Sequence, residues 1–119
     1  MTDEKHNIDL FLGTGGGPEG VLAASALDTY GCGFQGRFIF NTDKLKKRAN
    51  KMGINDFDKK YKLGEIVKGD SLFCATGITK GDLVNGVKLR GNKMVVNTLM
   101  THKSQNMKKI VTGEIDIKR

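Results

Sequence analysis

The chain has 119 residues, a formal net charge of +7, a single proline, no tryptophan and 38% hydrophobic residues. This composition is typical of a globular domain and excludes collagen-like and intrinsically disordered chains. No apolar run approaches the roughly 20 residues of a membrane span, and residues 1–7 lack the basic-then-apolar pattern of a secretory signal. We therefore expect a cytoplasmic protein with no membrane partner.

The excess of positive charge raises the question of a nucleic-acid partner. Five of the basic residues lie between positions 44 and 51, on a predicted helix whose inward stripe is Leu45, Ala49 and Met52. No aromatic residues alternate with these bases as they do in a stacking surface. We expect no nucleic-acid partner and only a general attraction to anionic metabolites.

The first elements predicted are a strand, a glycine-rich turn and a helix. Residues 8–12 form an apolar run typical of a short buried strand, after a tail at residues 1–7 that we expect to be disordered. Residues 18–30 have the pattern of a helix, with Pro18 in its first turn and Gly31 as its C-terminal stop.

The turn between them, residues 12–20, has the sequence LGTGGGPEG. Backbone N–H groups and the helix dipole at such a helix start favour an anion. Glu19 would repel that anion unless a divalent cation lies between its carboxylate and a phosphate oxygen. We therefore predict a metal-assisted phosphate site in which Glu19 binds the metal, and the backbone at Gly15 and the hydroxyl of Thr14 are available to the phosphate.

Other interpretations of the turn remain open. Gly15, Gly17 and Gly20 satisfy the spacing G-x-G-x-x-G of dinucleotide-binding loops, with Asp43 as a ribose-binding acid. A Walker A loop is excluded because no Lys-Ser or Lys-Thr pair follows Gly20. The turn is alternatively a tight connection in which Glu19 only complements the helix dipole.

Beyond the first helix, the pattern predicts parallel strands covered by helices. Strands are expected at residues 34–40 and 71–75, with a helix capped by Asn41 or Thr42 that runs to Met52 and a short helix at residues 63–67. In a parallel sheet the loops at residues 13–19, 41–43 and 76–82 would meet at the carboxyl ends of the strands.

The C-terminal section changes to an antiparallel pattern. Strands are predicted at residues 87–90, 93–100 and 108–117, with Gly91–Asn92 as a turn. The chain therefore has an α/β pattern with an antiparallel C-terminal section, and residues 8–119 form one unit. Because its first strand is already buried, we expect neighbouring strands to come from sequence outside this chain.

The remaining reactive side chains give weaker signals. Cys32 and Cys74 lie in apolar surroundings and are expected to be free, buried thiols. His6 and His102 belong to no ligand cluster. Acids at positions 43, 70 and 82 stand at element junctions, where caps and turn residues are the usual role.

Two stretches carry a resemblance to a known family: DLFLGTGGGPEGV at residues 9–21 and FCATGIT at residues 73–79. They closely resemble the class II, glpX-type fructose-1,6-bisphosphatases, and similar segments continue to residues 97–100. The resemblance implies a layered α/β fold of the lithium-sensitive sugar-phosphatase type. It further implies hydrolysis of the 1-phosphate of fructose 1,6-bisphosphate with Mn²⁺ or Mg²⁺, in gluconeogenesis and glycerol use.

Carried over by position, Glu19 matches the family's metal-binding glutamate and Gly16 a substrate-contacting glycine. Gly17 and Lys80 depart from the commoner family residues. The resemblance covers only the C-terminal third of the enzyme, so catalytic residues and the other metal ligands would lie upstream of Met1. It therefore implies a catalytically incomplete part of an enzyme that we expect to be a homo-oligomer; a non-catalytic interaction fragment is the other alternative.

Overall fold

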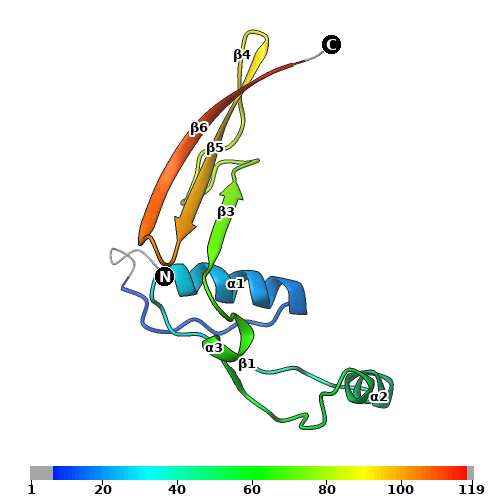
Figure 1. Cartoon of the computed structure of the whole chain (residues 1–119). Helices are drawn as coiled ribbons and strands as arrows, with labels where there is room; N and C mark the ends of the chain where they lie inside the picture. The colour runs from blue at the N-terminus through cyan, green and yellow to red at the C-terminus, as the bar shows by residue number, and fades with distance from the viewer. Residues whose placement is uncertain (1–6, 118–119) are drawn as a thin grey trace.

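The computed structural model describes residues 7–117. A long antiparallel hairpin rises from a base formed by a helix, and a second helix lies on an arm to one side (Figure 1). The radius of gyration is 18.2 Å, whereas a compact domain of this length has about 14 Å. The elongated shape leaves much of the chain without a covering layer.

The first helix, α1, spans Gly17–Thr29, with Pro18 in its first turn. Gly31 follows in the left-handed region at φ +67° and ends the helix. The predicted helix at residues 18–30 and its glycine stop are therefore confirmed within one residue at each end.

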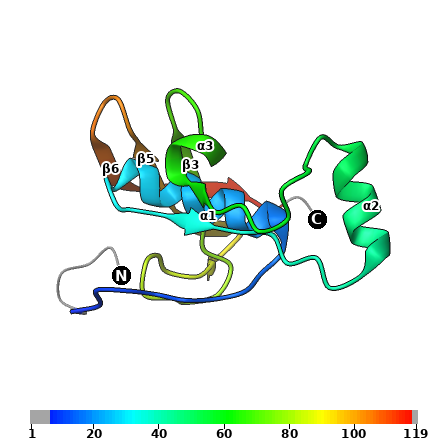
Figure 2. The ribbon, with the colours of Figure 1, turned by 90° about the horizontal axis from the view of Figure 1, so that it is seen from below.

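The predicted strand at residues 8–12 is wrong. These residues are extended but pair with no strand in the described part of the chain, and Leu10, Phe11 and Leu12 are 72%, 69% and 83% exposed. Figure 2 shows the segment running apart from α1 before it joins the helix start. An apolar run becomes a strand only when neighbouring strands accept its backbone hydrogen bonds, and residues 7–117 supply none to this segment.

The predicted strand at residues 34–40 is mostly wrong as well. Only β1, Gln35–Gly36, is a strand, and it pairs antiparallel with β2, Tyr61–Lys62. The aromatic residues that made the segment look like a buried strand pack on one another instead. Phe38 contacts Phe40 and Tyr61, and Phe40 contacts Phe57.

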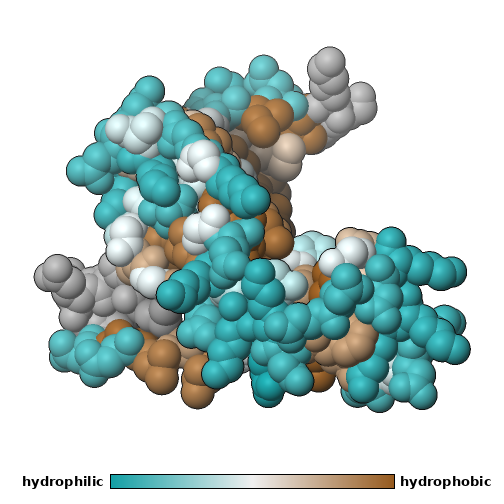
Figure 3. Space-filling view, turned by 60° about the horizontal axis from the view of Figure 1, so that its bottom comes forward, coloured by the Kyte–Doolittle hydropathy of each residue, from teal (hydrophilic) through white to brown (hydrophobic). Residues whose placement is uncertain are grey.

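The second helix, α2, spans Asp43–Lys51 and begins where the sequence predicts. The Thr42 hydroxyl accepts a hydrogen bond from the Leu45 N–H at 3.3 Å, which caps the helix. Helix α2 lies on the arm, where Ala49 is buried and the basic side chains are exposed. This part of the surface is mostly hydrophilic in Figure 3. The short helix α3, Leu63–Ile66, confirms the one predicted at residues 63–67.

The main sheet contains β3 (Leu72–Thr76), β4 (Lys88–Arg90), β5 (Lys93–His102) and β6 (Met107–Asp116). Strand β5 lies at its centre and pairs with the other three, always antiparallel. The predicted C-terminal strands are confirmed, with Gly91 in a left-handed turn at φ +59°. The predicted parallel sheet is wrong: β3 does form from the apolar run, but it joins the antiparallel sheet through β5.

Few apolar side chains are buried. Among the described residues, the buried hydrophobic ones are Ala24, Ala49 and Leu99, whereas the buried polar ones are Asp28, Thr29, Ser71 and Thr101. The four polar residues lie where the second half of α1 packs on the sheet, so hydrogen bonds carry much of that contact. No helix in residues 7–117 is long and apolar enough to cross a membrane.

Both cysteines are free thiols, as the sequence predicts. Cys74 is nevertheless exposed and Cys32 only half-buried, so their expected burial is wrong. Cys74 belongs to β3, one of whose faces lacks a covering layer in the described residues. The apolar run does form a strand, but the burial that such a run implies needs a second layer.

Candidate functional site

The glycine-rich turn leads directly into the N-terminus of α1. Gly16 is the N-cap residue, no side chain caps the helix, and the first helical bond runs from the Gly20 N–H to the Gly16 carbonyl at 3.0 Å. The N–H groups of Gly17 and Glu19 belong to the first turn, where a helix has no internal acceptor for them. Unpaired donors at a helix start favour an anion such as phosphate.

The Glu19 side chain folds back over Gly16. A β-carbon built on Gly16 would overlap the Glu19 carboxylate, whereas one on Gly17 would meet nothing within 4 Å. The carboxylate therefore lies against backbone at the one position in the turn where a glycine makes room for it. Gly15 and Thr14 are exposed in the same turn, and no hydrogen bond within residues 7–117 engages the Thr14 hydroxyl.

A divalent cation would find one ligand in this turn. No group of three or more His, Cys, Asp or Glu side chains that could hold a metal occurs in the described range. Magnesium-type sites often use one or two carboxylates together with waters and substrate phosphates, so Glu19 fits as a single ligand.

The structure does not gather the other predicted loops around the turn. Because the sheet is antiparallel, no common carboxyl edge of parallel strands exists among residues 7–117. Asp43 lies in the first turn of α2 on the arm, and Asp82 lies in a bend after β3. Asp82 thus agrees with the turn role predicted for it, whereas Thr42 and not Asp43 caps α2. His6 lies outside the described residues.

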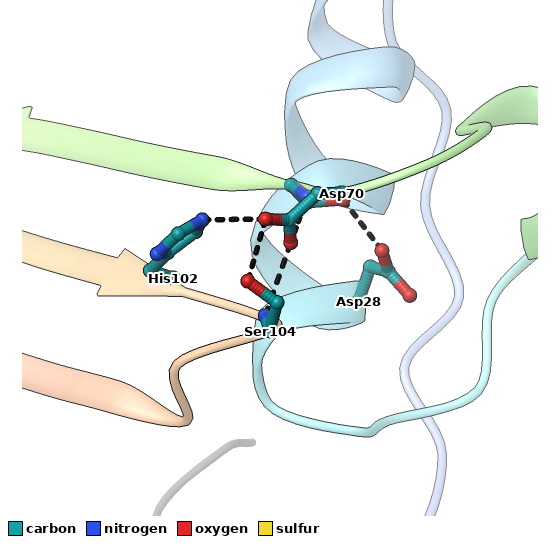
Figure 4. A network of polar contacts seen from close by, with 5 residues as sticks. Asp28, Asp70, His102 and Ser104 are labelled. Atoms are coloured by element: carbon teal, nitrogen blue, oxygen red, sulfur yellow. Dashed lines mark hydrogen bonds and ion pairs between the residues drawn. The ribbon is translucent and has the colours of Figure 1, made fainter.

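A polar cluster at the base of the hairpin was not predicted from the sequence. Asp70 accepts hydrogen bonds from the Ser104 hydroxyl at 2.6 Å, the Ser104 N–H at 3.0 Å and the Ser71 N–H at 2.9 Å. The Nε2 atom of His102 lies 2.7 Å from the same carboxylate (Figure 4). His102 therefore has a hydrogen-bond partner that the sequence does not indicate, and Asp70 joins the start of β3 to the β5–β6 turn.

These contacts hold the Asp70 carboxyl in its ionised form. The Ser104 hydroxyl is the largest cause, and with the two N–H groups and His102 it lowers the pKa of Asp70 from 3.8 to about 2. The spacing between Asp70, His102 and Ser104 in the sequence does not indicate this cluster. It depends on the β5–β6 turn bringing residues 102–104 beside the start of β3.

A second carboxylate anchors α1 to the sheet. Asp28 is buried, and it accepts hydrogen bonds from the Ser71 hydroxyl and from the Lys103 ammonium, whose Nζ lies at 2.9 Å. The bond from Lys103 is the main reason that the pKa of Asp28 is lowered. Beside it, the hydroxyls of Thr29 and Thr101 lie 2.7 Å apart. The second half of α1 is thereby fixed to β3 and β5, while its first half, with the glycine-rich turn, extends beyond the sheet.

Comparison with known proteins gives the same family by two routes, a family model and individual relatives. Residues 1–114 match the family model of the bacterial fructose-1,6-bisphosphatase that is glpX-encoded. The chain is 34% identical over 120 residues to a protein of Trichormus variabilis named D-fructose 1,6-bisphosphatase class 2/sedoheptulose 1,7-bisphosphatase, a match covering 89% of this chain and 35% of that protein.

Proteins of other organisms that are also named as class 2 fructose-1,6-bisphosphatases and sedoheptulose 1,7-bisphosphatases are similar as well. One from a Synechococcus strain is 36% identical, over 78% of this chain and 30% of its own length. Another, from Acaryochloris marina, is 39% identical over 71% of this chain and 28% of its own length. The chain thus spans about a third of the length of the curated relatives that it matches.

Proposed function

Because the chain belongs to the family of bacterial, glpX-encoded fructose-1,6-bisphosphatases, we propose that it is one part of a metal-dependent sugar bisphosphatase. The reaction would be the hydrolysis of the 1-phosphate of fructose 1,6-bisphosphate to fructose 6-phosphate and phosphate. The observation that carries this proposal is the Glu19 carboxylate folded over Gly16, beside N–H groups of the α1 start that have no acceptor within residues 7–117.

Each residue of the turn has a role in this proposal. Glu19 is a ligand of Mn²⁺ or Mg²⁺, and Gly16 leaves room for its carboxylate while presenting backbone to the substrate. Gly15 and Thr14 contact the phosphate through backbone and hydroxyl groups. When bound, the cation would supply Lewis-acid stabilisation of charge on the phosphoryl oxygens.

The proposal includes the rest of the enzyme. The other metal ligands and the catalytic residues lie in the two thirds of the family length that this chain does not match, and together the parts form a layered fold of the lithium-sensitive phosphatase type. We place the enzyme in the cytoplasm as a homo-oligomer that serves gluconeogenesis and glycerol use. Sedoheptulose 1,7-bisphosphate, which the relatives' names include, is a second candidate substrate.

The dinucleotide-binding alternative lacks its structural context in residues 7–117. The loop with Gly15, Gly17 and Gly20 does not follow a paired strand, and the next strand, β1, pairs antiparallel with β2. Dinucleotide loops of this type join two parallel strands through a helix. Glu19 would also face the pyrophosphate without a cation.

The test uses a chimeric enzyme, in which this chain replaces the matched third of the Trichormus variabilis relative. Replacing Glu19→Gln in the chimera should lower Mn²⁺-dependent phosphate release from fructose 1,6-bisphosphate by roughly a hundredfold or more, because several kcal/mol of Lewis-acid stabilisation depend on that ligand. Steady-state rates at saturating Mn²⁺ provide the measurement.

The matched control is Asp43→Asn, which removes the equivalent acid from the first turn of α2. It should leave the rate within about twofold, since surface substitutions of this kind have small effects. A Glu19→Gln chimera that turns over at the unmodified rate would exclude the metal role.

A further inference from the structure

Helix α2 carries a row of positive charges along one face. Residues three, four and seven positions apart lie on the same side of an α-helix. Four cations of α2 follow this spacing and form what we name the basic row: Lys44, Lys47, Arg48 and Lys51. Their side chains are all exposed, and together they line one open hollow of about 460 Å³. Four positive charges therefore surround a single depression of the surface.

No acidic side chain within residues 7–117 balances the basic row. The ion pairs of this part of the chain involve other cations, at positions 59, 90, 93, 102 and 103. The single acid of α2, Asp43, lies about 100° around the helix from Lys44, and it does not line the hollow. Like charges three and four residues apart repel, so the row raises the free energy of α2 unless an anion neutralises it.

The contacts of α2 with the arm lie on the face opposite the basic row. Ala49, the buried residue of the helix, is about 140° around the helix from Lys44. Lys46 is about 160° from Lys44 by the same helical period, and its Nζ lies 5.8 Å from the centre of the Phe57 ring. Figure 2 shows α2 apart from the main sheet, which leaves the row open in the described part of the chain.

The dimensions of the basic row indicate the kind of anion that fits it. From Lys44 to Lys51 the helix rises by about 10 Å, which is too far for one phosphate group to contact all four side chains. A chain of phosphate groups carries several negative charges in a line and meets each cation in turn. The hollow has the size of a small-ligand site, roughly 300–1,000 Å³. A stable protein interface needs about 800 Å² on each partner, more than one face of a nine-residue helix provides.

We propose that the basic row binds linear polyphosphate anions, either inorganic polyphosphate or the triphosphate group of a nucleotide. The Arg48 guanidinium contacts phosphate oxygens through paired N–H groups, and the lysine ammonium groups add point charges on both sides of it. The general attraction of a chain with a net charge of +7 to anions thereby gains a defined site. The proposal rests on α2 alone, so it stands whether or not Glu19 binds a metal.

The experiment titrates the 119-residue chain with sodium tripolyphosphate in a calorimeter, at an ionic strength of about 0.15 M. Charges more than roughly 8 Å apart are largely screened in this buffer. We expect saturable binding to one site, and binding of inorganic phosphate that is at least about tenfold weaker, because a single phosphate makes fewer charge-assisted hydrogen bonds. Absence of saturable tripolyphosphate binding, or equal affinity for inorganic phosphate, would overturn the proposal.

ATP, titrated under the same conditions, distinguishes the two sources of the anion. Affinity equal to that of tripolyphosphate would support the triphosphate group of a nucleotide as the ligand. Weaker affinity would support inorganic polyphosphate, because its chain has no nucleoside at one end. Tighter binding of a short single-stranded oligonucleotide than of tripolyphosphate would assign the row to nucleic acid and would overturn the proposal.

Two double variants, each of which lowers the net charge by two, provide the matched control. Lys47→Gln with Arg48→Gln removes the centre of the basic row and should weaken tripolyphosphate binding by at least about tenfold. Lys46→Gln with Lys60→Gln removes one cation from the opposite face of α2 and one exposed cation from the following loop, and should change the affinity by less than about twofold. Glutamine has nearly the helix propensity of lysine and arginine, so α2 should persist in both.

The comparison of the two double variants separates a site from a general effect of charge. Equal losses of affinity in both would show that the chain attracts anions only through its net charge, and would overturn the proposal. Neither measurement uses phosphatase activity, so a failure of this proposal and a failure of the proposed function are seen separately.

Discussion

At the scale of single residues, the closest structural relation in the turn is between Glu19 and Gly16. Their spacing of three places both in one helical turn, and the absence of a side chain on Gly16 lets the carboxylate lie over the backbone. This arrangement brings a negative charge to a helix start whose N–H groups favour an anion. A bridging cation would relieve that conflict, which is why the Glu19 substitution is the most direct test of the proposed function.

Asp70 has a strongly lowered pKa. Its pKa in the folded protein is about 2, below the ordinary 3.8, chiefly through the Ser104 hydroxyl. A carboxyl whose folded pKa is depressed stabilises the fold above its unfolded pKa, and this stabilisation is lost as the pH falls through the folded pKa. The relevant window therefore lies between pH 4 and pH 2.

We predict that Asp70→Asn removes part of the acid sensitivity of the fold. The variant should be less stable than the unmodified chimera at pH 5, and the difference should narrow as the pH falls toward 2, because protonated Asp70 no longer attracts its partners more than asparagine does. Thermal melts of both proteins from pH 5 to pH 2.5 provide the measurement.

Asp82→Asn is the control, since Asp82 lies in a bend without a hydrogen bond or ion pair among residues 7–117. Its melting temperature should follow that of the unmodified protein at every pH. A constant difference in melting temperature between Asp70→Asn and the unmodified protein over the whole pH range would contradict the assignment of this acid sensitivity to Asp70.

At the scale of elements, the contact between α1 and the sheet is mainly polar. Thr101 on β5 has no exposed surface, and its hydroxyl lies 2.7 Å from that of Thr29 near the end of α1. Asp28 continues the contact through Ser71 and Lys103. A buried polar contact is favourable only in the one arrangement that satisfies all its groups, so it fixes the orientation of α1 on the sheet.

We predict that Thr101→Val destabilises the chimera by about 1 kcal/mol, because valine keeps the shape of threonine but cannot hydrogen bond to Thr29. Thr29 would keep its bond to the Ala26 carbonyl at 2.7 Å, which limits the loss. Urea denaturation provides the measurement.

The control is Thr98→Val on the same strand, where the hydroxyl pairs with Thr76 at 2.8 Å in an exposed position. That change should cost less than about 0.5 kcal/mol, since water can replace the lost partner. Equal losses of stability in Thr98→Val and Thr101→Val would show that burial does not increase the contribution of the Thr29–Thr101 hydrogen bond.

At the scale of the whole molecule, the chain has little core for its size. Only three hydrophobic residues are buried within residues 7–117, and the radius of gyration exceeds that of a compact domain by about 4 Å. Burial of apolar surface is the main favourable term in folding, so the described residues supply little of the stabilisation that a compact domain of this length has.

We predict that the isolated 119-residue chain has no measurable bisphosphatase activity, because one carboxylate and a phosphate-facing turn do not supply the several ligands of a metal-assisted site. It should also be marginally stable and self-associate through its exposed apolar surface. Phosphate release and sedimentation across a concentration series test the two statements. Phosphate release by the isolated chain would contradict the first statement. A monodisperse monomer with a sharp cooperative melt would contradict the second and would favour an independent interaction module.

The sequence by itself determined those elements whose start and stop signals lie within a few neighbouring residues. Pro18, Thr42 and the left-handed Gly31 fixed where helices begin and end, because capping and backbone freedom act within a few residues. Alternating residues and the Gly91 turn determined the C-terminal strands in the same way.

Only the tertiary structure decided which strands pair and which polar groups meet. The apolar runs at residues 8–12 and 71–75 look alike in the sequence, yet the second pairs antiparallel with β5 and the first has no partner in the described chain. Periodicity reports the faces of a strand but does not identify its neighbours. Likewise, Asp70, His102 and Ser104 come together across 34 residues of sequence through the register of β3 and β5, a non-local property that no spacing in the chain encodes.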